Sequence, residues 1–200
     1  MFSLWLLALL AAPPSPPPDP RPIPPRPGLS WAESDALGRK LQDIEGRKSG
    51  ARSETVPVSQ AELNSYLNLG LGSRLPQGLS GLDVRMLGPD RLEATASLDL
   101  DQVRDHLPPT RGFNPLLLLS GRVPVELKLR LQNGDGFGSL DFEEIRLGGY
   151  LLPVSLLQQI VLSATRSADN PEGFDLLAPF RLPYAVKRVH LQPGRALLDL

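Results

Sequence analysis

Apolar and polar residues alternate along four stretches in the middle of the chain. In residues 123–131 every odd position is Val or Leu, and most of the even positions carry a charge. This period of two predicts a strand with one apolar face. The same pattern recurs over residues 82–86, 92–100 and 140–147. Because the segments between paired strands are mostly short, we expect an antiparallel sheet.

The alternation changes phase within the last of these strands. Leu140 and Phe142 occupy even positions, whereas Ile145 occupies an odd one, so one residue at Glu143–Glu144 is extra. An inserted residue that returns the apolar side chains to the same face is a β-bulge. Because bulges bend and coil a strand, we expect this sheet to be strongly curved.

Three segments show a helical pattern instead. Ser30 and Ser59 each precede a Glu by three residues, which is the spacing of a capping box at a helix start. The first helix should run to about Lys48, the second should be short, and a third should follow Pro153 over residues 154–166. Together these elements predict an α+β fold, in which a strongly curved antiparallel β-sheet wraps around the long N-terminal helix. The helix near 154–166 is then a second packing helix.

The N-terminal residues differ in composition from the rest. Residues 1–12 resemble the apolar part of a secretory signal and are shorter than the ~20 residues needed to span a bilayer. Residues 13–28 form a proline-rich extended linker, read as a disordered leader, a stalk or a ligand for a proline-binding module. Residues 29–200 are expected to form a single α+β domain. The protein is predicted to be exported, either to the periplasm or out of the cell. If residues 1–12 are not cleaved, they would associate it with a membrane.

Charge and composition narrow the possible partners. The formal net charge is -1 and basic and acidic residues are interspersed, so the basic footprint of a nucleic-acid-binding protein is missing. Aromatic residues make up only 6%, which predicts an aliphatic interior. The chain has no Cys, which excludes attachment of a lipid to a cysteine.

Candidate catalytic or metal-binding residues are few: His106, His190, Asp99 with Asp101, and Glu143 with Glu144. The histidines lack metal-ligand spacing, and the aspartates fit a strand end and a helix cap. The two glutamates would point to opposite faces of a regular strand. Because no nucleophile motif or phosphate-binding loop is present, we predict a non-enzymatic protein without metal or cofactor.

The apolar strand faces predict a binding site for an apolar molecule. Ala94 and Ala96 leave space on their face, where a helix or a ligand can come close. Either the sheet and helix close over a filled leucine-rich core, or they leave a slot for an acyl chain. The residues of this slot would be Ala94, Ala96, Leu127, Leu129, Phe142, Leu41 and Leu157. Its rim would be Phe113, Leu116, Leu117, Leu118 and Leu119, unless these leucines are the buried entry to a strand.

Several motifs carry a resemblance to a known group of proteins. They are "PVSQAELNSYL", "SGRVPVELKLRL", "GGYLLPVSLLQQIV" and "PFRLPYAVKRVHLQPGRALL". The chain resembles the small exported bacterial YpmS-like proteins and, more distantly, single-domain tubular lipid-binding (TULIP-type) proteins. The resemblance covers roughly residues 30–200 and implies a coiled antiparallel sheet around a long helix. It also implies binding of a lipid or other apolar molecule, contact with a membrane surface, and a role in lipid transfer or envelope maintenance. The alternative is an envelope scaffold or protein-interaction domain with a fully packed core and no ligand.

Overall fold

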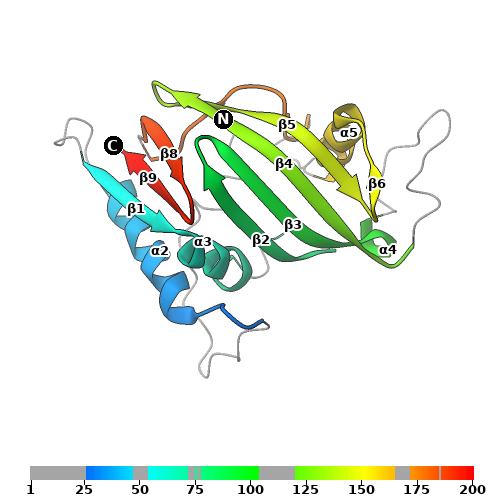
Figure 1. Cartoon of the computed structure of the whole chain (residues 1–200), viewed down its shortest axis with the longest axis horizontal. Coiled ribbons are helices and arrows are strands. Elements are labelled where there is room, and N and C mark those ends of the chain that lie inside the picture. The colour runs from blue at the N-terminus through cyan, green and yellow to red at the C-terminus, as the bar shows by residue number, and fades with distance from the viewer. Residues whose placement is uncertain are drawn as a thin grey trace.

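Two antiparallel sheets lie beside each other in the computed structural model of the chain (Figure 1). The structure describes residues 26–46, 54–71, 75, 78–103, 120–164, 172–184 and 186–200. The three-stranded sheet has the order β1 (Thr55–Ser59), β9 (Arg195–Asp199), β8 (Arg188–Gln192). The six-stranded sheet runs β2 (Leu79–Gly88), β3 (Arg91–Asp99), β4 (Arg122–Gly134), β5 (Phe137–Leu147), β6 (Tyr150–Leu151), and β7 (Phe180–Arg181) pairs with β5.

Helices lie at two places around these sheets. The described helices are α2 (Trp31–Glu45), α3 (Gln60–Ser65) with the π-helical turn η1 (Tyr66–Gly70), α4 (Leu100–Val103) and α5 (Val154–Ala164). The helical segments α2, α3 and η1 lie beside the three-stranded sheet, whereas α4 and α5 lie at the opposite end of the six-stranded sheet (Figure 1). None of the described helices has the length and apolar composition needed to cross a membrane.

The predicted fold class is confirmed at the level of an α+β protein with antiparallel sheets and an N-terminal helix. The finer prediction, of one strongly curved sheet wrapped around that helix, is wrong for the described residues. The strands divide into two sheets, neither of them strongly curled. The predicted bulge is present, because the register of β4 and β5 shifts between Lys128 and Leu129. The bulge therefore perturbs one strand pair without rolling the sheet around α2.

The capping boxes predicted from Ser30 and Ser59 have different outcomes. Ser59 and Glu62 form a complete box, in which the Ser59 hydroxyl accepts from the Glu62 N–H and Glu62 accepts from the Ser59 N–H. Ser30 accepts a bond from the Ala32 N–H, but its own N–H donates to the hydroxyl of Ser65 at 3.1 Å. The bond to the Ser30 N–H, which Glu33 would make in a complete box, is thus made by Ser65 of α3. It ties the start of α2 to α3.

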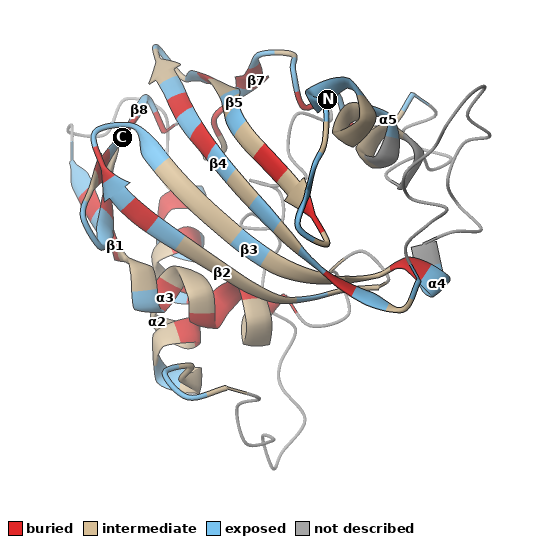
Figure 2. Cartoon of the chain, turned by 45° about the vertical axis from the view of Figure 1, so that its right-hand side comes forward, coloured by how far each residue is buried: buried red, intermediate tan, exposed pale blue. Residues whose placement is uncertain are grey.

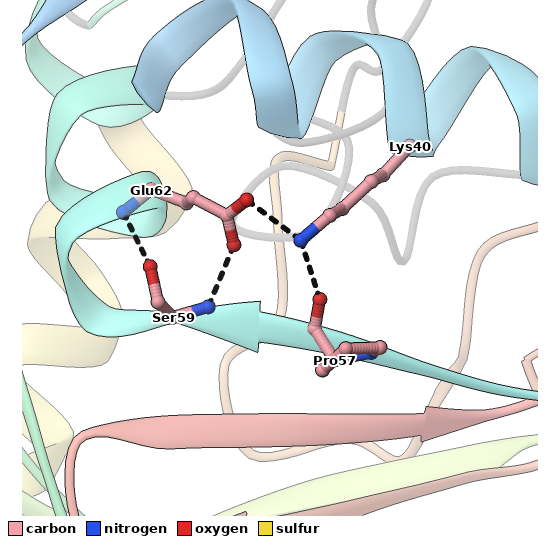
Figure 3. Close-up of polar contacts among 4 residues, drawn as sticks. All are labelled: Lys40, Pro57, Ser59 and Glu62. Atoms are coloured by element: carbon pink, nitrogen blue, oxygen red, sulfur yellow. Dashed lines mark hydrogen bonds and ion pairs between the residues drawn. The ribbon is translucent and has the colours of Figure 1, made fainter. Parts of the chain in front are cut away.

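A buried carboxylate also joins α2 to α3 and β1. Glu62 is 7% exposed, and its Oε1 lies 2.6 Å from Nζ of Lys40 on α2 (Figure 3). The same ammonium group donates to the carbonyl of Pro57 on β1 at 2.7 Å. The carboxylate thus serves as both helix cap and ion-pair partner, which compensates the cost of burying it.

Side chains of α3 and η1 bond the free edge of β2. Gln60, Asn64 and Asn68 are spaced four residues apart and so lie on one side of their helical segment. The Asn64 carboxamide donates to the Val84 carbonyl at 3.0 Å and accepts from the Val84 N–H at 2.8 Å. Gln60 accepts from the Met86 N–H, and Asn68 donates to the Leu82 carbonyl. An edge strand with free backbone groups can pair with another chain, and these bonds occupy that edge.

The edge of β8 is bonded in the same way. Asn133, at the end of β4, donates to the Val189 carbonyl at 3.0 Å and accepts from the Val189 N–H at 2.6 Å. Asn64 at the edge of β2 and Asn133 at the edge of β8 therefore each make the pair of backbone bonds that a residue of a neighbouring strand would make. The turn after β8 completes the link between the sheets, because the Gly194 N–H donates to the Met86 carbonyl at 2.9 Å.

Candidate functional site

The candidate site lies on the apolar face of the six-stranded sheet. The register places Val84, Ala94, Leu127 and Ile145 in one row across β2, β3, β4 and β5. A neighbouring row contains Ala96, Val125 and Leu147. The alternation in the sequence thus produced a continuous apolar surface across several strands, as predicted.

Both ends of this apolar face are covered. At one end, Met86 and Leu131 belong to a buried cluster with Val189, Leu191 and Ala196 of the C-terminal hairpin. At the other end, Leu100, Val123 and Leu147 form a second buried cluster, against which Leu98, Val125 and Leu152 pack. These two clusters are the cores that hold the sheet at its ends.

The middle of the face is less well covered. All nine residues of β3 are described and none is buried, although β3 has a neighbouring strand on each side. Figure 2 shows this strand in tan and pale blue along its length. On the adjacent strand β4, Val123, Leu129 and Leu131 are buried, whereas Val125 and Leu127 between them are partly exposed. We call the partly exposed residues Ala94, Ala96, Val125, Leu127 and Phe142 the central apolar patch.

The structure places the predicted slot residues in three different surroundings. Ala94, Ala96, Leu127 and Phe142 belong to the central apolar patch, and Leu129 is buried beside it at 4% exposure. Leu41 of α2 is buried against α3, β1 and η1, in a cluster with Val58, Tyr66 and Leu67. Leu157 lies on α5 and is partly exposed. The predicted rim residues, Phe113 and Leu116 to Leu119, lie outside the described residues.

The helix that borders this region of the sheet at β5 is α5. The Gln158 side chain of α5 donates to the Asp175 carboxylate at 2.7 Å and accepts from the Leu176 N–H at 2.8 Å. Gly173 has a positive φ of 78°, and a Cβ there would lie 2.1 Å from the Leu162 carbonyl oxygen, so this close approach requires glycine. Phe174 and Leu176 are buried. The segment around residues 173–176 thus fastens α5 from one side.

The opposite face of the sheet carries ion pairs. Glu143 bonds to Arg130, and Glu144 lies 2.9 Å from Arg146 and 3.3 Å from Lys128. The prediction that the two glutamates point to opposite faces is wrong, because the bulge lets both reach the charged row of β4. Arg130 holds the pKa of Glu143 below its usual value, and Arg146 and Lys128 do the same for the pKa of Glu144. Lowered pKa values favour ionised carboxylates and not a proton-donating pair.

These ion pairs predict a pH-dependent contribution to stability. The folded pKa values are depressed, so the contribution is complete above the unfolded value of about 4.3 and is lost as the pH falls through the folded values. Replacing Glu143→Gln and Glu144→Gln should therefore lower the free energy of unfolding at pH 7, and the difference from the parent should shrink at about pH 3. Urea unfolding at the two pH values measures this difference. If the variant and the parent differed by the same free energy of unfolding at both pH values, these ion pairs would not be the source of the pH dependence.

The remaining candidate motifs have local roles. Asp99 caps α4 by accepting from the N–H groups of Asp101 and Gln102, whereas the cap was predicted at Asp101. His190 is exposed and lies 2.8 Å from Asp199, as expected for a locally bonded histidine. His106 lies outside the described residues. Within the described chain, no three His, Asp or Glu residues gather as a metal site would require.

Comparison with known proteins found no matching family model, no matching curated protein and no matching solved structure. The resemblance to exported lipid-binding proteins therefore stays a prediction. Residues that the sequence reasoning missed are Gln60, Asn64, Asn68 and Asn133, which bond the two sheet edges. The four-residue spacing of the first three was visible, but nothing local indicates that they face a strand.

Proposed function

We propose that this protein is an exported, non-enzymatic domain that binds a lipid-like molecule on the central apolar patch. The observation that carries the proposal is the burial pattern of the six-stranded sheet. Both ends of its apolar face are buried, and so are Leu129 and Ile145 nearer its middle, whereas the residues of the central apolar patch are partly exposed. A contiguous apolar surface left open to solvent is unfavourable unless something covers it, and such patches often bind ligands or partners.

The chemistry of the patch favours an aliphatic ligand. Its members are Ala, Val, Leu and one Phe, and its two alanines are two residues apart on β3 and so lie on the same face. Small side chains let a ligand approach the backbone of the sheet, and saturated side chains make dispersion contacts along an acyl chain. The supporting helix in this proposal is α5, because α2 packs on α3 and η1. A role in lipid transfer or envelope maintenance would follow from such binding.

Ligand binding can be tested directly on the full chain. Organic extraction of the purified protein should release a lipid-like molecule in stoichiometric amount, which mass spectrometry identifies. The stripped protein should then take up a fluorescent fatty-acyl probe in a saturable manner. A protein that yields no lipid and takes up no probe would overturn the proposal and favour the alternative, a scaffold domain with a filled core.

A further inference from the structure

A second apolar surface lies at the end of the six-stranded sheet, where β6 leads into α5 (Figure 1). Tyr150, Leu151 and Val154 are 64%, 65% and 37% exposed. We call these three residues the apolar corner. Single exposed leucines are ordinary, but three large apolar side chains within five consecutive residues concentrate exposed apolar surface at one place.

A tight turn and a short strand form this corner. Gly148 and Gly149 have φ values of 58° and 85°, as in a two-residue hairpin turn with left-handed positions. The strand β6 that follows pairs with β5 through two residues, Leu151 opposite Arg146 and Tyr150 opposite Leu147. Successive strand residues point to opposite faces, yet Tyr150 and Leu151 are both about two-thirds exposed. Both residues of β6 are therefore largely open to solvent, although Leu147 opposite Tyr150 is buried.

The helix behind the corner is also incompletely covered. The α5 residues whose burial is described are 154–159, 161 and 162, and none of them is buried (Figure 2). Among these eight residues, Leu156, Leu157, Val161 and Leu162 are partly exposed although they are aliphatic. An apolar helix that leaves its side chains partly exposed has a surface available for another apolar phase.

We propose that the apolar corner and the adjoining surface of α5 dock on a lipid bilayer. The charge pattern fits this partner, because residues 147–165 contain no Asp, Glu, Lys, Arg or His although 22% of the chain is charged. Charged groups are costly inside a bilayer, so an inserting segment should lack them. In the sequence, Arg146 precedes this uncharged run and Arg166 follows it. Tyr150 has the apolar ring and polar hydroxyl that are typical of membrane interfaces.

This inference goes beyond the proposed function and concerns different side chains. The central apolar patch could bind a ligand whether or not the corner reaches a membrane. The corner could likewise dock on a bilayer if the patch held no ligand. The two proposals therefore have separate readouts, probe uptake for the patch and insertion depth for the corner.

The chain has no Cys, so a single reporter can be placed without removing a native thiol. Leu151→Cys, made in the full chain and labelled with an environment-sensitive fluorophore, should show a blue-shifted, brighter emission when vesicles are added. The matched control is Leu87→Cys, because Leu87 is 47% exposed near the far end of β2. The dye at this position should stay in water. A quencher attached to the acyl chains should reduce the emission at position 151 and not at position 87.

Vesicles of phosphatidylcholine alone and of phosphatidylcholine with phosphatidylglycerol separate apolar insertion from simple charge attraction. Insertion of an uncharged surface should occur on both and should survive high salt. In addition, Leu151→Ser should weaken vesicle binding about tenfold, because a largely exposed leucine would be transferred from water.

Four results would overturn the inference. Equal responses at positions 151 and 87, or vesicle binding with no response at 151, would show that another segment such as residues 1–12 carries the attachment. Binding only to anionic vesicles at low salt would indicate charge attraction. A response at 151 that depends on protein concentration without vesicles would instead assign the corner to contact with a second copy of the chain.

Discussion

Replacing Asn64→Leu should lower the free energy of unfolding by about 3 kcal/mol, from the loss of three hydrogen bonds at about 1 kcal/mol each. The Asn64 carboxamide bonds to the Val84 N–H at 2.8 Å, the Val84 carbonyl at 3.0 Å and the Asp83 carboxylate at 2.8 Å. Leucine has a similar size and offers none of these groups. The edge of β2 would then lose one of the three side chains that bond it, which leaves the Val84 backbone groups free, so the variant should also self-associate more readily.

Urea unfolding and size-exclusion chromatography measure the two effects. Asn64→Asp is a useful companion, because the carboxylate still accepts from the Val84 N–H but cannot donate to the Val84 carbonyl. It should be destabilised as well, since the new charge lies beside Asp83. Asn68→Leu, which removes two donated bonds, should lose about 2 kcal/mol. An Asn64→Leu protein within about 0.5 kcal/mol of the parent would show that water replaces these bonds without cost.

The importance of Asn64 also explains which parts of the fold the sequence could predict. Strands, caps and the bulge depend on residues close together in the chain, such as the alternation over 123–131 and the Ser59–Glu62 pair. The alternating strands, the bulge and the Ser59–Glu62 box are confirmed, whereas the box at Ser30 is completed by Ser65 and the cap of α4 is Asp99 and not Asp101. The division into two sheets depends instead on bonds between distant residues, such as Asn133 with Val189. A polar residue gives no local sign of the strand it will bond, so the sequence alone suggested a single sheet.

In the candidate site too, the features set by nearby residues were predicted and those set by distant contacts were not. Ala94 and Leu127 were predicted on one apolar face, and the register places them opposite each other. This worked because period-two alternation fixes the face of every residue once a strand is identified. Leu41 was assigned to the slot because the N-terminal helix was expected inside the sheet. It lies instead in a cluster with α3 and η1, against which Leu82 and Val84 of β2 pack. Ser65 and Glu62 anchor α2 there.

The double variant Ala94→Leu with Ala96→Leu should abolish uptake of the fatty-acyl probe. Each leucine adds about three carbon atoms to the central apolar patch and would displace a similar length of acyl chain. At about 0.8 kcal/mol for each buried methylene, two leucines would lower the binding free energy of the ligand by about 5 kcal/mol. This corresponds to a loss of more than about a thousandfold in affinity. Titration of the stripped protein with the probe measures the change.

The stability of the same variant distinguishes an open patch from a filled core. If the face over β3 is free for a ligand, the added leucines meet space, and the free energy of unfolding should stay equal or rise. If protein side chains already pack there, overpacking should cost about 1–3 kcal/mol. Thr95→Leu is the matched control, because Thr95 is exposed on the opposite face of the same strand and should leave uptake unchanged. A double variant that keeps full uptake, or that unfolds, would place the ligand elsewhere or exclude it from this face.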